Sequence, residues 1–204
     1  QGAEQLRDED IPNMAILDTY QWDEENRLKQ SYVKGTYTDY CYDYTGQRTN
    51  RKHNQGEYIY ASPYFEMQYF QKWSKHIYVG DTRLAVKVSH YMPLSQINNY
   101  NREFDKRNIF VLHQDHLGST NVISNYEGKL YEHLEYTPYG ETFVDEAPNP
   151  IEKVNYKFTG KEYDPESLLY YFGARYHDAL FSRWLSPDPG EVGVNWYQYC
   201  GNNP

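Results

Sequence analysis

Aromatic and polar positions in the first part of the chain predict short strands joined by tight turns. The stretches Tyr20–Leu28 and Tyr40–Arg48 each begin with two aromatic residues two positions apart, which places both rings on one face of a strand. An aspartate follows in each stretch, and three residues later stands Asn26 or Gly46. Aspartate bonds to turn backbone, and Asn or Gly tolerates positive φ, so both stretches are predicted hairpins that repeat every 20 residues.

The later pattern predicts further strands. Tyr78–Val88 is a hairpin-like stretch whose second half alternates apolar and other residues. Residues 92–108 are rich in Asn and charge and are predicted to form an exposed excursion, with a short helix over 96–104 as an alternative. No segment has convincing helical periodicity, so an all-β class is predicted. Its later strands are expected at Phe110–His113, Asn121–Ser124, Lys129–Tyr136 and Glu141–Val144, followed by a surface loop at Glu146–Pro150.

The composition indicates that tyrosine supplies much of the apolar surface of these strands. The 204 residues include 24 Tyr, and aromatics make up 18% although all hydrophobics are only 39%. A tyrosine buries a large ring and still keeps a hydroxyl for water or a partner, which suits sheets with a wet face. The formal charge of −9 argues against nucleic acid or an anionic membrane as partner. No apolar run approaches the roughly 18 residues of a membrane span.

The termini and cysteines leave further questions open. Residues 1–10 lack the apolar core of a signal peptide, and the absence of an initial Met leads us to expect a processed or partial chain. Cys41 and Cys200 are the two cysteines. They can be free packing residues or a bridge, and neither has zinc spacing.

Candidate chemistry is sparse. His113 and Asp115 share one strand face and His116 points away, so too few ligands converge for a metal; a turn before Gly118, with Ser119 and Thr120 bonding to local backbone, is expected instead. The sequence Gly173-Ala174-Arg175 is too short for a phosphate loop, and Ser119 and Ser186 lack a nucleophile elbow. Neither a metal nor a cofactor is therefore predicted.

Both halves of the sequence resemble a known family. The aromatic-Asp turn pattern with its step of 20 resembles YD repeats, and the second half resembles the Rhs repeat-associated core domain. The second resemblance rests on six ordered stretches, which are His113–Thr120, Leu134–Gly140, Phe158–Asp164, Leu169–Tyr176, Arg183–Pro189 and Asn195–Pro204.

The resemblance implies a spiralling ribbon of antiparallel hairpins that forms a hollow shell and ends in a core domain curled inward as a plug. Both faces of the shell wall are then expected to be wet. The implied division is 14–90 for YD-repeat hairpins, 91–108 for a connector and 109–204 for the Rhs core. The implied partners are a C-terminal toxin segment of the same protein, the rest of its shell, and a secretion-system or toxin complex, with a secreted or cell-surface location.

The resemblance also implies autoproteolysis of an aspartic-protease type, which needs two carboxylates that share a proton. By motif, Arg175 and Asp188 match the positions used, and the second aspartate lies beyond Pro204, so this chain is predicted not to cut itself. The alternative for Arg175 and Asp188 is a salt bridge that braces the plug. His177-Asp178-Ala179 departs from the family's usual Tyr-Asp-Pro, and Asp178 is interpreted as a turn residue.

Two other functions remain open. Aromatic hairpin repeats of about 20 residues also occur in modules that bind choline or glycans through aromatic cages. A third hypothesis is a surface adhesion shell like that of teneurins, without toxin or proteolysis.

Overall fold

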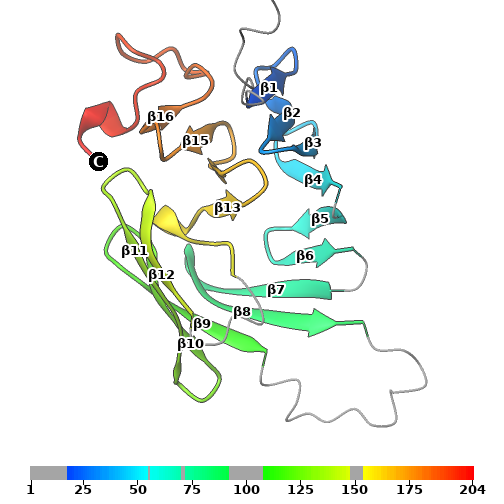
Figure 1. The fold of residues 1–204 in the computed structure, drawn as a ribbon, viewed down its shortest axis with the longest axis vertical. Helices are drawn as coiled ribbons and strands as arrows, with labels where there is room; N and C mark the ends of the chain where they lie inside the picture. Colours follow the sequence, from blue (N-terminus) through cyan, green and yellow to red (C-terminus); the bar gives the residue numbers. More distant parts are fainter. Residues whose placement is uncertain (1–17, 55, 70–71, 92–107, 148–153) are drawn as a thin grey trace, which may run out of the picture.

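One antiparallel sheet of twelve strands, which we call the wall, dominates the fold. The computed structural model describes residues 18–54, 56–69, 72–91, 108–147 and 154–204. Each wall strand is hydrogen-bonded to the next one along the chain (Figure 1). The strands are β1 (Thr19–Trp22), β2 (Leu28–Val33), β3 (Thr36–Tyr42), β4 (Arg48–His53), β5 (Gly56–Ser62), β6 (Phe65–Gln68), β7 (Lys72–Val79), β8 (Thr82–His90), β9 (Ile109–Gln114), β10 (Thr120–Asn125), β11 (Leu130–Tyr136) and β12 (Thr142–Glu146).

Residues 154–204 form a second body, the inner unit, which lies inside the bend of the wall (Figure 1). Its four strands are antiparallel and also pair in chain order. The predicted all-β fold, a ladder of hairpins followed by a core that turns inward, is confirmed. The inner elements are η3 (Phe158–Gly160), β13 (Glu162–Asp164), β14 (Leu169–Tyr171), β15 (Tyr176–Asp178), β16 (Arg183–Trp184) and η4 (Cys200–Asn202).

Five wall hairpins share one turn geometry. In each, the first turn residue donates its N–H to the carbonyl four residues on, and the fourth residue has positive φ. The side chain of the first residue accepts backbone N–H groups of the turn, as Asp43 does from Thr45 and Gln47 at 2.8 and 3.0 Å. A shift of strand register accompanies every one of these turns. The five turns begin at Asp23, Asp43, Asp115, Asn125 and Thr137.

Gly140 is the fourth residue of the last of these turns, and it is expected to be the most sensitive to a side chain. It has φ 92°, and a Cβ there would lie 2.5 Å from the ring of Phe158. Gly140→Ala is expected to lower the free energy of unfolding by about 2–4 kcal/mol. The cost of a side chain in a left-handed backbone conformation adds to the cost of overpacking against Phe158. Gly128→Ala, at φ 77° with nothing within 4 Å, should cost only about 1 kcal/mol. The midpoint of urea unfolding measures both, and equal losses would contradict the role of the Phe158 contact.

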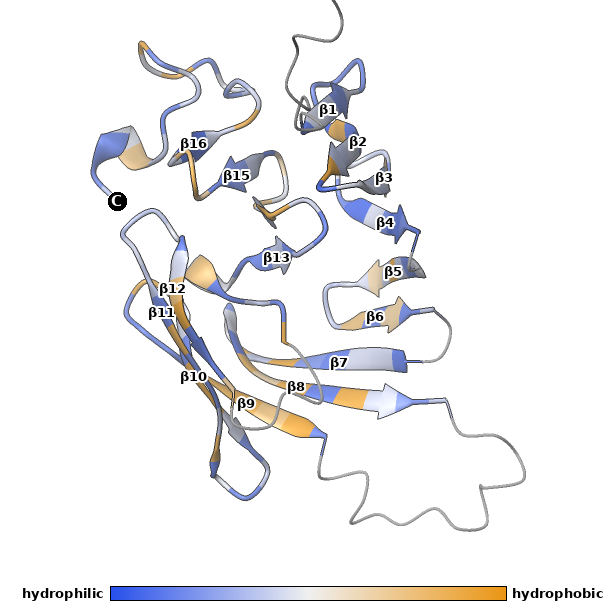
Figure 2. Ribbon diagram, viewed as in Figure 1, coloured by the Kyte–Doolittle hydropathy of each residue, from blue (hydrophilic) through white to orange (hydrophobic). Residues whose placement is uncertain are grey.

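The apolar core lies mainly between the wall and the inner unit, in three small clusters rather than one. Figure 2 shows apolar positions gathered on β8, β9 and β10. One cluster joins these strands to Val154, and another joins Leu28 and Tyr40 of the wall to Leu169 and Tyr176 of the inner unit. The third is centred in the inner unit and consists of Phe158, Tyr170, Ala179, Trp184 and Tyr199.

The expectation that the wall is wet on both faces is wrong for this part of the shell. The inner unit covers one face, so Tyr40 is only 4% exposed, whereas Tyr44 in the turn after it is 98% exposed. Within the inner unit Tyr170 and Tyr176 are 1% and 2% exposed. Tyrosine therefore serves here both as surface and as core material.

The predicted hairpins are confirmed as β1–β2, β3–β4 and β7–β8. The degenerate third unit forms β5–β6, which turns after Ser62. The excursion over 92–108 and the alternative helix over 96–104 lie almost wholly outside the described residues. β8 pairs with β9, so the strands before and after the undescribed residues belong to one sheet. The division into 14–90, 91–108 and 109–204 stays a prediction.

Candidate functional site

The structure brings Arg175 and Asp188 together. Arg175 lies between β14 and β15, Asp188 lies in the loop after β16, and Nη1 of the arginine is 3.3 Å from Oδ2 of the aspartate. The side chains are 17% and 27% exposed. The guanidinium lies over the ring of Trp184, 4.2 Å from its centroid, so the arginine is held by an aromatic face as well as by charge.

Backbone groups fix the orientation of this pair. Arg175 Nη1 and the Asp188 N–H both donate to the carbonyl of Trp196, at 3.3 and 3.0 Å. Asp188 Oδ1 accepts the N–H of Gly190 at 2.8 Å. The arrangement presents one oriented carboxylate, which is half of what aspartic-protease chemistry requires.

Asp178 is a turn residue, as predicted from the sequence. It ends β15, and its carboxylate accepts the N–H of Phe181 at 3.1 Å. Ser182 in the same turn has φ 57°. Burial raises the pKa of Asp178 above its usual value. The contacts of Asp178 are those of a turn cap and include neither Arg175 nor Asp188.

Two of the residues considered as metal ligands, His113 and Asp115, have other partners. His113 Nε2 lies 2.9 Å from Ser124 Oγ, and Asp115 accepts the N–H groups of Leu117 and Ser119. The turn itself is therefore as predicted, but Asp115 caps it rather than Ser119. Ser119 Oγ instead accepts the N–H of Thr159 at 3.0 Å, 40 residues away. In the described part of the chain no three His, Cys, Asp or Glu residues gather as a metal site.

Cys41 and Cys200 are both free and exposed. The predicted alternative of two free cysteines is therefore confirmed and the bridge is wrong, but both side chains are exposed rather than packed. Among the described residues no helix has the length and apolar character needed to cross a membrane.

The largest charged cluster of the described residues was not predicted from sequence. It joins β4 of the wall to β13 of the inner unit and to the turn that follows β13. Arg48 contacts Asp164 at 2.5 Å and Glu162 at 2.7 Å. We call Arg48, Arg51, Glu162, Asp164 and Glu166 the ionic cluster.

Four members of the ionic cluster are buried, and the side chain of the fifth, Glu166, is 13% exposed. The side chains of Arg51 and Asp164 are 0% exposed, and their closest nitrogen and oxygen are in direct contact. Glu162 also accepts the hydroxyl of Tyr60 at 2.8 Å, and Arg48 lies 4.3 Å from the centroid of Tyr171. A buried charge without a partner is costly, so these groups are mutually dependent.

The electrostatics follow from this packing. Burial alone would lower the pKa of Arg48 and Arg51, but Asp164 raises both well above the usual value. Burial raises the pKa of Glu162 in spite of the two arginines. Burial also acts to raise the pKa of Glu166, yet the hydrogen bond from His53 and the charge of Arg51 bring it down to about 2.

A shift of strand register explains why Arg48 and Arg51 face the same side. Residues three apart on a regular strand point to opposite faces. The turn after Asp43 shifts the register, so that Cys41 pairs with Asn50 and Tyr42 pairs with Arg48. Both arginines are then buried, at 4% and 0% exposed. The first repeat has the same register shift, which pairs Trp22 with Leu28, and Leu28 is 0% exposed. Arg48 stands 20 residues after Leu28, at the equivalent position of the next repeat, and this equivalence is the sequence signal that could have predicted its burial.

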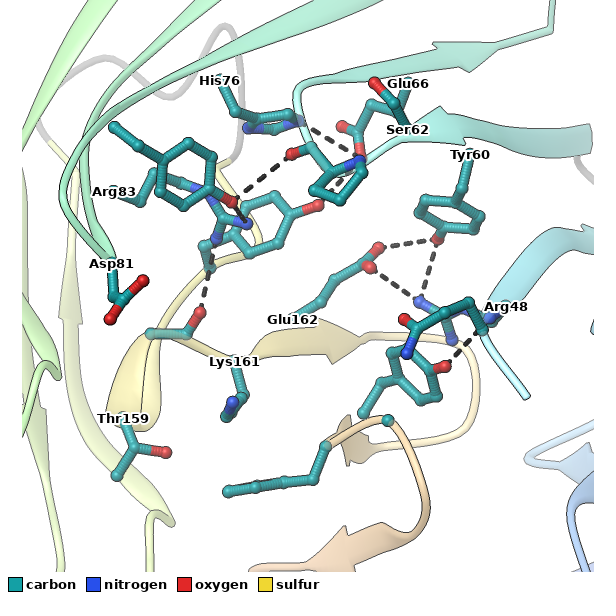
Figure 3. A pocket seen from close by; sticks show the side chains of 18 of the residues that line it. Arg48, Tyr60, Ser62, Glu66, His76, Asp81, Arg83, Thr159, Lys161 and Glu162 are labelled. Carbon is teal, nitrogen blue, oxygen red and sulfur yellow. Dashed lines mark hydrogen bonds and ion pairs between the residues drawn. The ribbon is translucent and has the colours of Figure 1, made fainter. Parts of the chain in front are cut away.

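A second contact lies beside the ionic cluster, around a cavity of about 840 Å³ between the wall and the inner unit (Figure 3). Tyr156 donates to Glu66 at 3.0 Å, and the guanidinium of Arg83 lies 3.2 Å from the centroid of the Tyr156 ring. Arg83 also donates to the carbonyl of Gly160 at 3.3 Å. The two bodies are thus joined by buried polar contacts as well as by apolar packing.

A wall of hairpins with an inner body docked on one face defines the class of protein, a β-shell segment with its plug. Residues 14–204 match the family model Teneurin YD-shell. The chain belongs to this family.

Curated relatives include bacterial and animal proteins. The chain is 29% identical over 198 residues to tRNA3(Ser)-specific nuclease WapA of Bacillus spizizenii and 26% identical over 195 residues to Teneurin-3 of Mus musculus, with 91% of the chain covered in each. It is 38% identical over 92 residues to toxin subunit YenC1 of Yersinia entomophaga, covering 43% of the chain. The chain spans 8%, 7% and 9% of these three relatives.

A crystal structure of TcdB2-TccC3-Cdc42 has the same fold over this region. The TM-score is 0.75 at 23% identity, and the match covers 92% of this chain and 10% of that one. The similarity of fold agrees with the shell and plug seen here.

Proposed function

We propose that in the full-length protein this segment closes one end of a β-shell that encloses a C-terminal toxin segment. The main support for this proposal is the ionic cluster, which holds the inner unit inside the bend of the wall. Wall strands β1 to β12 serve as shell, and the inner unit serves as plug. In this proposal the three-part division at 14–90, 91–108 and 109–204 describes hairpin shell, connector and core.

The proposed partners are the enclosed segment and the rest of the shell, and a toxin or secretion complex delivers them to a secreted or cell-surface location. Support comes from the relatives, which include a nuclease and a toxin subunit. Teneurin-3 supports the alternative, an adhesion shell without toxin. An aromatic module that binds glycans or choline is the remaining alternative, and saturable binding of either ligand by the full-length protein would favour it.

Undocking the plug tests the encapsulation. In the full-length protein, Arg51→Glu places a carboxylate against Asp164 and is expected to speed tryptic digestion of the region after Pro204 by about 100-fold or more, since breaking a buried pair costs about 3–5 kcal/mol. Lys52→Glu is the matched control, because Lys52 is the next residue of β4 and points outward. Rapid digestion in wild type, or equal protection in Arg51→Glu, would contradict an enclosing plug.

We also propose that Arg175 and Asp188 form half of an autoproteolytic site in the full-length protein. Arg175 orients the Asp188 carboxylate, and a second aspartate beyond Pro204 shares a proton with it and activates water at the scissile bond. The oriented, partly exposed ion pair supports this role. A bracing salt bridge is the competing role, and the two are separated by the cleavage experiment discussed below.

A further inference from the structure

One titratable group lies at the centre of the inner unit without any polar partner. His177 is the middle residue of β15, pairs with Tyr170 and Trp184 on the neighbouring strands, and is 0% exposed. Neither ring nitrogen has a hydrogen-bond partner among the described residues. A buried polar group without a partner is rare in native structures and calls for an explanation.

Aromatic rings from four different segments of the inner unit surround His177. The ring centroid of Tyr199 is 4.4 Å away, that of Trp184 5.5 Å, that of Phe172 5.9 Å and that of Phe158 6.4 Å. These rings come from the segment before η4, from β16, from the segment after β14 and from η3. A change at His177 therefore affects the packing of four separate segments of the inner unit.

The charged groups around this cage do not favour a cation inside it. Lys161 lies 5.4 Å from the centroid of Phe172, and Arg175 lies 4.2 Å from that of Trp184, so two cage rings already carry a cation. Asp178 follows His177 on the strand and therefore points to the opposite face, where it caps its own turn. The remaining charges of the packed elements are engaged elsewhere: Arg183 with Tyr197, Lys157 with Asp145 and Glu132, Asp164 with Arg48 and Arg51, and Asp188 with Arg175.

We propose that His177 is an acid-sensitive lock of the inner unit, which packs as a neutral ring and opens β15 and β16 when it takes up a proton. A protonated imidazole would gain some cation–π attraction from the cage, but loss of hydration outweighs it for an ion without a carboxylate partner. Burial accordingly lowers the pKa of His177 to about 4. The device does not depend on autoproteolysis.

The direction and size of the expected pH dependence follow from the linkage between protonation of His177 and opening of β15 and β16. The opened state protonates near pH 6.5 and the closed state near pH 4, so closure is fully favoured above pH 6.5 and weakens as the pH falls toward 4. Relative to pH 7.5, the opening equilibrium should rise about tenfold at pH 5.5 and roughly 70-fold at pH 4.5. Glu166, with its pKa near 2, titrates below that range, whereas burial raises the pKa of Asp178 and of Glu162. Both carboxyls are present in wild type and in His177→Phe, so the difference between the two proteins isolates the effect of His177.

Hydrogen exchange of the full-length protein tests the proposal. Peptides covering 176–184 are followed by mass spectrometry between pH 7.5 and 4.5, with rates corrected for intrinsic exchange at each pH. Wild type should lose protection by the factors given above, whereas His177→Phe should stay within about twofold. His113→Gln is the control, because His113 is a wall histidine bonded to Ser124 and should behave like wild type.

Two results would overturn the proposal. One is constant protection of 176–184 in wild type across this pH range. The other is an unchanged loss of protection in His177→Phe. Should His177→Phe fail to fold, His177→Tyr supplies the same comparison, since it also removes the titrating ring.

Discussion

Replacing Asp164 with asparagine is expected to lower the free energy of unfolding by about 3–5 kcal/mol, because it leaves two buried guanidiniums short of a carboxylate. Asp164 contacts both Arg48 and Arg51, and its side chain is fully buried. Glu162 remains 2.7 Å from Arg48 but lies 3.7 Å from Arg51, and burial already raises its pKa, so it does not replace both contacts of Asp164. Urea unfolding of the full-length protein, followed by pulse proteolysis of the 48–164 region, measures the loss.

Asp39→Asn is the matched control for this substitution. Asp39 lies on the exposed face of β3, where it accepts a hydrogen bond from Gln30 at 2.8 Å, and its loss should cost less than about 0.5 kcal/mol. Similar effects of Asp39→Asn and Asp164→Asn would show that the ionic cluster does not hold the inner unit in place.

In the full-length protein with its native sequence after Pro204, Asp188→Asn is expected to slow self-cleavage by at least about 100-fold. Asparagine keeps the shape and the Gly190 hydrogen bond but cannot share or take a proton, and acid–base catalysis by a positioned group contributes about 10²–10⁴-fold. The intact and cut chains are separated by gel electrophoresis at timed intervals after synthesis.

The control for Asp188 is Asp178→Asn, which changes a turn cap of the same unit and should leave cleavage within about threefold of wild type. Hydrogen exchange over 183–198 separates the two roles of Asp188. A bracing salt bridge predicts lost protection with cleavage unchanged, and an uncut wild-type chain would end the protease proposal.

Local signals in the sequence predicted the wall well, because each hairpin is specified by its own residues. The aspartate and the Asn or Gly three positions later make the turn at 23–26 and at 43–46, and both fall where predicted. Arg175 and Asp188 were assigned to one site because Gly173–Tyr176 and Arg183–Pro189 resemble Rhs core motifs. In the structure Nη1 of Arg175 lies 3.3 Å from Oδ2 of Asp188.

The ionic cluster could not be predicted in the same way. Strand alternation alone assigns Arg48 and Arg51 to opposite faces, and the register shift after the Asp43 turn puts them on one. Their partners Glu162 and Asp164 are more than 110 residues away in sequence.

By itself, the sequence determined the class of the protein: an antiparallel ladder of hairpins whose turns are set by short-range hydrogen bonds within five residues. Only the tertiary structure decided which face of that ladder is covered, which charges are buried and that His177 lies in an aromatic cage. The physical reason is that burial and pairing arise when the inner unit docks against the wall, and that contact joins residues no local pattern connects.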